Sequence, residues 1–476
     1  MMKALVLSLS LIFPLSVPAQ SFEPLDEAIQ QGAFGNLKAV IVSQYGDVVF
    51  EGYYRGAQPG DLHQVQSVTK SVGSALVGIA ARKGLVQADQ PLGDYFSGLY
   101  DMSSNALSNK SNITVAQVLQ QRHGLQWDED DSDYRDPANP VTQMIQSDDW
   151  YRFVLEQPMA AAPGTAFAYS SGASTLMSRV VRVATGMGPD EFAQQELFEP
   201  LGIDAVHWEI YSEQGLGNGI TQWPNPDHDP SLGFSLWMPA RGLLKFGELY
   251  LNGGVHEGRR ILDESWVEAS WTRYSHAGNS DYFYRPGWGH GYQWWIARVA
   301  DPAGREWTVY FASGWGSQVI FVIPDLGAVI VTVADNYDYN GPDVDVMLIS
   351  RILPELSPRL DSGYSGSWYD TATSGQGFSL EVLEKRGALV SYWYTYTPEG
   401  ALRWFILQGE LIDGVGEVVV YEASGGRFLQ GDEVSLAEWG TARFLPVDCM
   451  HLMLEVEAPG LSTTIPLTRL TGECRQ

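Results

Sequence analysis

The chain of 476 residues has 45% hydrophobic residues, 18% charged residues and a formal net charge of −28 at pH 7. Its length is about three times that of an average domain, which predicts a globular protein with more than one domain. Nucleic acids and anionic lipid surfaces are bound through lysine and arginine, so the acidic balance argues against both and we expect no nucleic-acid partner.

The first nineteen residues have the three-part pattern of a cleaved secretory signal. Lys3 precedes the apolar run ALVLSLSLIF, and the small residues Val17 and Ala19 stand where cleavage is expected. This run is shorter than the roughly 20 residues that cross a bilayer, and no later segment is better suited, so we expect no transmembrane segment. The sequence therefore predicts a signal peptide over residues 1–19 and a periplasmic or secreted mature protein.

The next part of the chain alternates between strand and helix patterns. A β-hairpin is predicted for residues 37–56, and the small apolar residues from Ser67 to Gly84 predict a tightly packed helix. Helical patterns separated by loops rich in Gly, Pro and Asp fill residues 85–270, and residues 317–335 predict a second hairpin. Hairpins at both ends of a helical middle indicate one antiparallel sheet, formed by both ends of the domain, with a helical subdomain against it.

After residue 360 the pattern changes to strands and turns with many aromatic residues. Tyr392, Tyr394 and Tyr396 alternate with Trp393, as in a β-strand. We predict a separate all-β domain, a small sandwich or barrel, over residues 361–476, which leaves residues 20–360 to the first domain. The aromatic stripe is interpreted as barrel core rather than as a platform for sugars.

The only two cysteines, Cys449 and Cys474, both lie in the last thirty residues. In an oxidising compartment we interpret them as a disulfide pair, the alternative being two buried thiols.

Ser67 and Lys70 carry the first chemical signal. Residues three apart on a helix share a face, so these side chains can come within hydrogen-bonding distance. The helix dipole and burial both disfavour an ammonium at a helix N-terminus, which lowers the pKa of Lys70. Of the seven lysines, only Lys70 has a serine three residues before it. We therefore expect a neutral amine that takes a proton from Ser67.

Tyr169 and Ser171, in PGTAFAYSSG, carry the second signal. They stand two residues apart on a short connection, and a phenol beside a lysine can pass a proton to a leaving group. A rival pair, Tyr250 and Asn252, is interpreted as the C-terminus of a helix.

The third signal is ASGWGSQ, residues 312–318, directly before a strong strand. Glycines on both sides of Trp315 allow the backbone to approach a ligand closely. A main-chain N–H near Ser313, Gly314 and Trp315 could then join that of Ser67 in binding an oxyanion. The alternative is an ordinary glycine turn.

These motifs, together with PARGLLKFGELYLNGG and SGWGSQVIFVIPDLGAVIV, resemble the serine β-lactamase and penicillin-binding-protein superfamily over about residues 25–355. The resemblance is greatest to its class C β-lactamase-related branch, which includes esterases, peptidases and 6-aminohexanoate-dimer hydrolases. It implies an α+β fold, with a β-lactamase-like antiparallel sheet and a helical subdomain, and acyl-enzyme chemistry. It also implies Ser67 as nucleophile, Lys70 as general base, Tyr169 as proton carrier to the leaving group, and Ser171 in place of the asparagine of a YxN motif.

One departure from this resemblance restricts the substrate. True β-lactamases have Lys-Thr-Gly on the last active-site strand, where the lysine helps to hold a carboxylate; the corresponding residues here are Ala312, Ser313 and Gly314. We therefore expect a small-molecule ester or linear amide as substrate. The alternatives are a β-lactamase, a D-amino-acid peptidase, or a non-catalytic module that binds cell-wall peptides.

No metal or cofactor is expected, because neither HExxH nor another ligand cluster is present, and a GxSxG elbow is also absent. His123 is interpreted as a loop or core residue. The acidic run from Asp128 to Asp133 is interpreted as a solvated loop, the alternative being a position at the rim of the cleft that attracts amine-bearing substrates. The C-terminal domain resembles aromatic, glycine-rich β modules appended to secreted proteins of Gram-negative bacteria, a resemblance that does not define a role. Binding to the cell envelope or to another partner is left open for this domain.

Overall fold

The computed structural model describes residues 21–130, 132–209, 223–276, 288–301, 303–338, 347, 351–373, 375–427 and 430–471. The predicted signal peptide, residues 1–19, lies outside them. The chain forms two compact units. The larger unit comprises Phe22–Asp301 and Glu306–Leu353, and the smaller unit contains Pro354–Gln476 with the short segment Pro302–Arg305.

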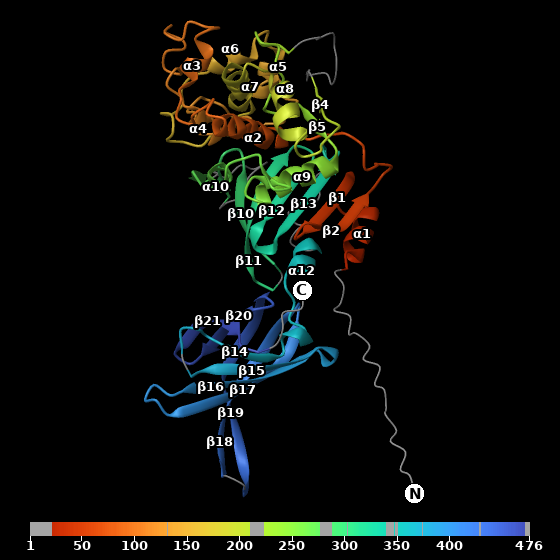
Figure 1. Ribbon diagram of the computed structural model, residues 1–476, viewed down its shortest axis with the longest axis vertical. Coiled ribbons are helices and arrows are strands. Elements are labelled where there is room, and N and C mark those ends of the chain that lie inside the picture. Colours follow the sequence, from red (N-terminus) through yellow and green to blue (C-terminus); the bar gives the residue numbers. More distant parts are fainter. Residues whose placement is uncertain are drawn as a thin grey trace. The chain divides into compact units, whose positions relative to one another are not determined.

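An eight-stranded antiparallel sheet forms the centre of the larger unit (Figure 1). From one edge to the other its strands are β2 (Asp47–Tyr53), β1 (Leu37–Gln44), β13 (Ala328–Ala334), β12 (Gln318–Ile323), β11 (Glu306–Gly314), β10 (Trp295–Ala300), β9 (Gly289–His290) and β8 (Ser275–His276). Smaller sheets are formed by β3 (His63–Gln64), β5 (Leu236–Met238) and β4 (His207–Trp208), and by β6 (Val255–His256) and β7 (Arg259–Arg260).

Both predicted hairpins are confirmed. β1 and β2 turn through Tyr45 and Gly46, both with positive φ, the backbone of a type I′ turn that matches strand twist. β12 and β13 turn at Pro324–Leu326, and Gly327 follows with φ of 56°. β1 pairs with β13, so the two ends of the unit join in one sheet, as the sequence predicts.

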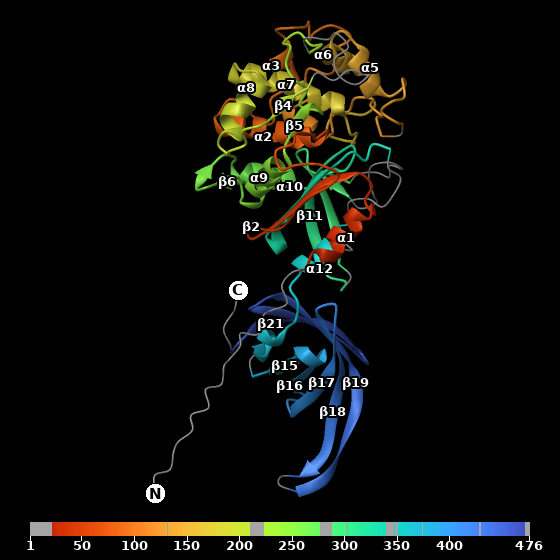
Figure 2. The same cartoon turned by 90° about the vertical axis from the view of Figure 1, so that its right-hand side faces the viewer.

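Helices cover this sheet and form the predicted helical subdomain, in which α3, α4, α5, α6 and α8 surround α2 and α7 (Figure 1). Figure 2 shows α9 and α10 on one side of the sheet and α1 on the other. The helices are α1 (Glu23–Gln30), α2 (Val68–Arg82), α3 (Leu92–Phe96), α4 (Val115–Leu119), α5 (Pro140–Gln146), α6 (Trp150–Leu155), α7 (Ser171–Thr185), α8 (Pro189–Ala193), α9 (Ala240–Leu251) and α10 (Glu264–Trp271). A π-helical turn, η1 (Gln194–Phe198), continues α8, and α12 (Leu353–Leu356) lies where the chain passes from the larger unit to the smaller one.

The small residues of α2 allow close packing. A side chain at Gly78 would overlap the ring of Trp266, and one at Gly73 would press against Leu232. Every residue from Val68 to Ala80 is buried. The predicted packed helix is thus confirmed, and it ends before Gly84, which has φ of 74°.

The smaller unit is a closed barrel of eight antiparallel strands. They are β14 (Gly366–Tyr369), β15 (Gly377–Leu383), β16 (Ala388–Tyr396), β17 (Leu402–Ile412), β18 (Val415–Arg427), β19 (Gln430–Asp448), β20 (His451–Ala458) and β21 (Leu461–Arg469). Closure leaves no unpaired sheet edge. The predicted all-β domain is therefore a barrel and not a sandwich.

The interpretation of the aromatic stripe as barrel core is wrong for its tyrosines. Side chains alternate along β16, so Trp393 points inward with 8% of its surface exposed, whereas Tyr394 is 51% exposed. Tyr392 and Tyr396 are exposed as well. The aromatic core comes from residues on several strands: Trp368, Phe378, Trp393, Phe405 and Phe444.

Two further expectations concern a disulfide and a membrane-spanning segment. Cys449 is disulfide-bonded, and Cys474, the chain's only other cysteine, lies outside the described residues, so their pairing stays a prediction. Among the described residues no helix has the length and apolar character needed to cross a membrane.

Candidate active site

Ser67 occupies the N-cap of α2, but its hydroxyl does not cap the helix. The residue before it, Gln66, is buried and has φ of 50°, which is uncommon for a residue with a side chain. One turn later Lys70 Nζ lies 2.8 Å from Ser67 Oγ. The predicted pair is thus brought together, at the point where a strained backbone enters a buried helix.

The amine of Lys70 has three polar neighbours. Besides Ser67 Oγ, it lies 2.8 Å from Ser171 Oγ and 2.9 Å from the carbonyl oxygen of Gly233. Burial lowers the pKa of Lys70 to about 8, against the opposing charges of Glu129 and Asp130. A large fraction of this lysine is therefore neutral near pH 8.

Ser171, the first residue of α7, is held by a carboxylate. Its hydroxyl donates to Glu129 Oε1 at 2.7 Å, and its main-chain N–H donates to Glu129 Oε2 at 2.7 Å. Glu129 Oε2 also accepts from Trp127 Nε1 at 2.5 Å, and Oε1 accepts from the Tyr134 hydroxyl at 3.1 Å. Four donors around one fully buried side chain fit an ionised carboxylate, which only accepts.

This arrangement fixes the direction of the Lys70 lone pair. The Ser171 proton points to Glu129, so Ser171 Oγ can only accept from Lys70, and the Gly233 carbonyl can only accept as well. A neutral amine has two N–H bonds, and these two acceptors take both. The lone pair is left facing Ser67 Oγ, where a general base is needed.

Tyr169 lies beside this amine. Lys70 Nζ is 4.8 Å from the centre of its ring, which stacks on Trp295 with centroids 5.5 Å apart. Burial raises the pKa of Tyr169 well above its usual value, and the charge of Glu129 adds to this, while a hydrogen bond with Ser67 opposes it. Tyr169 therefore stays a neutral phenol, which can donate a proton but is a poor base beside Lys70.

Buried polar side chains hold the Tyr169 segment in place. Ser170 caps α7 through the N–H of Ala173. His123 is confirmed as a core residue: Nε2 lies 2.9 Å from the Ala168 carbonyl oxygen, and Nδ1 accepts from the Leu125 N–H at 3.0 Å. Burial lowers the pKa of His123 to about 4, so it stays neutral and positions the chain next to Tyr169.

The predicted oxyanion segment lies against the nucleophile. A Cβ atom built on Gly314 would lie 2.3 Å from the Val65 carbonyl oxygen and 3.1 Å from the Ser67 main-chain nitrogen. Only glycine allows this approach. Ser313 is half-buried, and Trp315 packs against Tyr134, with ring centroids 5.5 Å apart. Ser313 and Gly314 therefore end β11 beside the start of α2, and residues 315–317 form the turn into β12, where Gly316 has φ of 87°. The segment is thus both a strand end next to the nucleophile and a glycine turn.

Ala312, at the position of the β-lactamase lysine, is buried in the core of the larger unit. The rival pair lies elsewhere: Tyr250 is buried against Trp294, and Asn252 ends α9, as predicted. Among the described residues, no three side chains of His, Cys, Asp or Glu are grouped as a metal site.

The interpretation of the acidic run as a solvated loop is wrong at its centre. Asp128 and Asp133 are exposed, but Glu129 and Asp130 are buried beside Lys70. Sequence reasoning missed Glu129 because its partner Ser171 lies 42 residues away. The only local signal is the pattern of Trp127 and Tyr134 around it, two side chains that carry a donor on an apolar body.

An antiparallel sheet flanked by helices, with a serine and a lysine on the first turn of a buried helix, defines the class of acyl-transferring serine enzymes. The Beta-lactamase family model matches residues 26–349, more than half of the chain. The chain therefore belongs to the β-lactamase family, and it is a serine hydrolase of that fold.

The chain is also similar to individual proteins, one by sequence and two by structure. The chain is 26% identical over 344 residues to 6-aminohexanoate-dimer hydrolase from Paenarthrobacter ureafaciens, covering 68% of this chain and 79% of that protein. A D-stereospecific amidohydrolase from Streptomyces sp. is 16% identical with a TM-score of 0.50, covering 68% of this chain and 98% of its own. An octameric penicillin-binding protein homologue from Pyrococcus abyssi is 16% identical with a TM-score of 0.51 and covers 94% of this chain and 99% of its own. At these identities the two structures show the fold alone.

Proposed function

We propose that the protein is an exported serine hydrolase that cleaves small esters or linear amides through an acyl-enzyme on Ser67. The observation that carries this proposal is the placement of Lys70 Nζ 2.8 Å from Ser67 Oγ, with two acceptors taking its N–H bonds. A buried lysine in this position has a chemical use that a binding module would not need.

In the proposed reaction Lys70 takes the proton from Ser67 Oγ, which bonds to the substrate carbonyl carbon. The N–H of Ser67 and a main-chain N–H of the Ser313–Trp315 segment stabilise the oxyanion. Tyr169 gives its proton to the leaving oxygen or nitrogen as the ester or amide bond breaks, and it regains a proton from Lys70. Water then attacks the acyl group by the same route and releases the acid.

The substrate class is proposed from Ala312, which carries no charge, and from the net charge of the chain. Ala312 offers no charge to a substrate carboxylate, and a net charge of −28 disfavours anionic substrates near the protein. One similar protein is named a 6-aminohexanoate-dimer hydrolase, a name that refers to a linear amide. These observations support a neutral or cationic ester or linear amide over a β-lactam.

Export and envelope binding are proposed on other grounds. The apolar run after Lys3 supports cleavage near Ala19 and a periplasmic or secreted protein. The exposed Tyr392, Tyr394 and Tyr396 of the barrel support contact with an envelope component. Co-sedimentation of the protein with purified cell walls tests this, and a Tyr394→Ser variant that sediments equally well would argue against the tyrosines.

The catalytic proposal is tested by replacing the nucleophile and the base. Ser67→Ala should lower turnover of p-nitrophenyl acetate by about 10⁵-fold or more, and Lys70→Met should be nearly as damaging, since groups that act as a unit are not additive. A serine-reactive fluorophosphonate should add one label, located on Ser67 by mass spectrometry. Wild-type turnover in Ser67→Ala would disprove the mechanism. A screen of p-nitrophenyl esters, D-amino-acid amides and nitrocefin then separates the substrate classes.

A further inference from the structure

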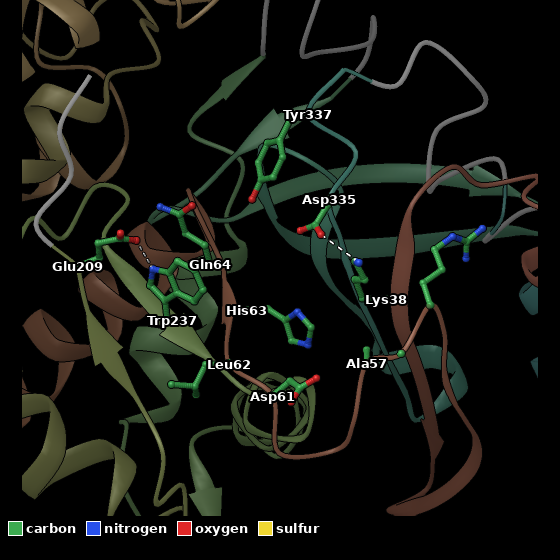
Figure 3. Close-up of a pocket in the computed structure, with 12 residues that line it drawn as sticks. Lys38, Ala57, Asp61, Leu62, His63, Gln64, Glu209, Trp237, Asp335 and Tyr337 are labelled. Carbon is green, nitrogen blue, oxygen red and sulfur yellow. Dashed lines mark hydrogen bonds and ion pairs between the residues drawn. The ribbon is translucent and has the colours of Figure 1, made fainter. Parts of the chain in front are cut away.

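A cavity of the larger unit lies beside the candidate active site, since Tyr337, one of its lining residues, packs against Trp315 with ring centroids 4.9 Å apart. Its volume is about 650 Å³, and Figure 3 shows its walls, which come from β1, the segment before β3, β3 itself, β5 and the end of β13. The lining residues are Lys38, Arg55, Gly56, Ala57, Asp61, Leu62, His63, Gln64, Glu209, Trp237, Asp335 and Tyr337. Ser67, Lys70, Tyr169 and Ser171 are not among them.

Three buried polar atoms on residues that line this cavity have no hydrogen-bond partner in the described structure: Glu209 Oε1, Gln64 Nε2 and His63 Nε2. Glu209 is only 5% exposed, and its other oxygen accepts from Trp237 Nε1 at 2.5 Å. Nearly all buried polar groups in proteins are hydrogen-bonded, because a buried group left unpaired has lost its hydrogen bonds to water without a replacement. Three such atoms around one cavity indicate that a polar ligand completes them.

The charges of the cavity define the ligand. Lys38 is paired with Asp335 at 3.2 Å (Figure 3), and the Arg55 guanidinium donates to the carbonyl oxygens of Leu37 and Ile29. Asp335 therefore offsets the charge of Lys38, while Arg55 is held by uncharged carbonyl oxygens. The lining carboxylates Asp61, Asp335 and Glu209 outnumber these two cations, and Glu209 Oε1 lacks a donor. An ammonium group supplies both the donor and the compensating charge.

The neighbouring side chains add a second requirement. Gln64 and Trp237 are cross-strand partners, and Trp237 is bonded to Glu209, so the Gln64 amide lies next to the carboxylate. Its free N–H group needs an acceptor such as a carbonyl oxygen. Burial lowers the pKa of His63, so this ring is neutral and adds no positive charge that would repel a cation.

We propose that this cavity binds a small organic molecule with a primary ammonium group and a nearby carbonyl, such as an amino-acid amide. The ammonium donates to Glu209 Oε1, the carbonyl accepts from Gln64 Nε2, and the indole of Trp237 and the side chain of Leu62 contact the alkyl part. Binding in this cavity does not require the Ser67 hydroxyl. The cavity is nevertheless close to the nucleophile along the chain, because Ser67 follows Gln64, the last residue of β3, by three positions.

Calorimetric titration of the full chain tests this site. The Ser67→Ala variant, which should not turn over the probes, is titrated with L- and D-leucinamide and with 4-methylpentanamide, which is leucinamide without its ammonium. We expect at least one leucinamide enantiomer to bind about tenfold or more tightly than 4-methylpentanamide, because a hydrogen bond to a charged group is lost. Glu209→Gln, made in the same background, should weaken leucinamide binding by about the same factor.

Two further variants complete the experiment. Glu268→Gln, an exposed position on α10, is the matched control and should bind like the parent. Gln64→Met removes the amide without changing the Glu209 charge, so it tests the site even when Glu209→Gln does not fold; it should weaken leucinamide and leave hexylammonium unaffected. Absence of leucinamide binding at 50 mM overturns the proposal. Binding that survives both Glu209→Gln and Gln64→Met overturns it as well, because the ligand then occupies another place.

Discussion

Burial and the charges of two nearby carboxylates shift the pKa of Lys70 in opposite directions. Burial favours the neutral amine that a general base requires, and Glu129 and Asp130 favour the ammonium. The balance leaves the pKa at about 8 instead of far lower. Glu129 therefore has two effects: it orients Ser171, and through its charge it keeps Lys70 able to hold a proton after taking it from Ser67.

This balance predicts the pH dependence of turnover. Only neutral Lys70 can accept a proton, so kcat/KM should fall as the pH drops through about 8, the pKa given by burial. Steady-state hydrolysis of p-nitrophenyl acetate between pH 5.5 and 9.5, corrected for the uncatalysed rate, measures this acid limb. A limb near pH 6 would be inconsistent with Lys70 as the base.

Glu129→Gln should move this limb to lower pH. The carboxylate stabilises the ammonium of Lys70, so its removal lowers the lysine pKa further, by about one pH unit. The glutamine amide can donate as well as accept, so it no longer fixes the proton of the Ser171 hydroxyl. The lone pair of Lys70 Nζ then loses its fixed direction toward Ser67, and kcat should fall by about a hundredfold. Asp128→Asn, next to Glu129 but exposed, is the control. A purely structural role for Glu129 would reduce activity without moving the limb.

Gly314→Ala tests how closely β11 must approach the nucleophile. The new methyl group would overlap the Val65 carbonyl oxygen at 2.3 Å, so either β11 or the segment before Ser67 must shift. We expect a loss of about a hundredfold in kcat/KM, since an oxyanion donor moves away. Gly60→Ala, where nothing lies within 4 Å, should leave the rate unchanged. Normal turnover in Gly314→Ala would exclude this segment from the oxyanion site.

At the scale of elements, local patterns predict most of the fold. The hairpins of β1–β2 and β12–β13 and the helix α2 follow from turn residues and from runs of small or apolar residues, and these act over a few positions. The direction in which each strand of the barrel faces could not be predicted. In LVSYWYTY one face carries three tyrosines and the other carries Leu389 and Trp393 with two hydroxyl residues, so alternation alone does not tell which face is inside. Barrel closure decides it, through Trp393 and its contacts with Phe378 and Phe405.

The register of β16 predicts unequal effects of neighbouring substitutions. Trp393→Ala removes a buried ring that stacks on Phe378 and should cost about 3–5 kcal/mol of unfolding free energy. Tyr394→Ala removes an exposed ring and should cost less than about 1 kcal/mol. Urea unfolding of each full-length variant, followed by tryptophan fluorescence for Tyr394→Ala and by circular dichroism for both, measures the difference. Equal destabilisation would mean that the strand is turned the other way.

At the scale of the whole molecule, the candidate site combines four distant segments of the chain. Ser67 and Lys70 lie on α2, Tyr169 and Ser171 at the start of α7, Glu129 in a loop, and Gly314 at the end of β11. Motif spacing finds the first two pairs because their residues are close in sequence. It cannot find the bond from Ser171 to Glu129, which exists only because α7 packs beside α2 and buries the loop that precedes α5.

All of these residues belong to the larger unit, which predicts the effect of removing the barrel. A chain that lacks residues 362–476 should hydrolyse p-nitrophenyl acetate within about twofold of the full-length rate, because no candidate catalytic residue is lost. The deletion does remove Val415 and Leu445, which pack on Ala303 in the connection between β10 and β11. The connection leads into the first residue of β11, whereas Gly314 is the last residue of that strand. Loss of order in the connection should therefore leave the approach of Gly314 to Ser67 intact.

Gel filtration and circular dichroism must first show a folded, monodisperse truncated protein, and fluorophosphonate labelling then counts its reactive serines. A folded truncated protein without activity would place part of the catalytic function in residues 362–476. Reduced activity that scales with a smaller labelled fraction would instead show that the barrel stabilises the hydrolase without taking part in its chemistry.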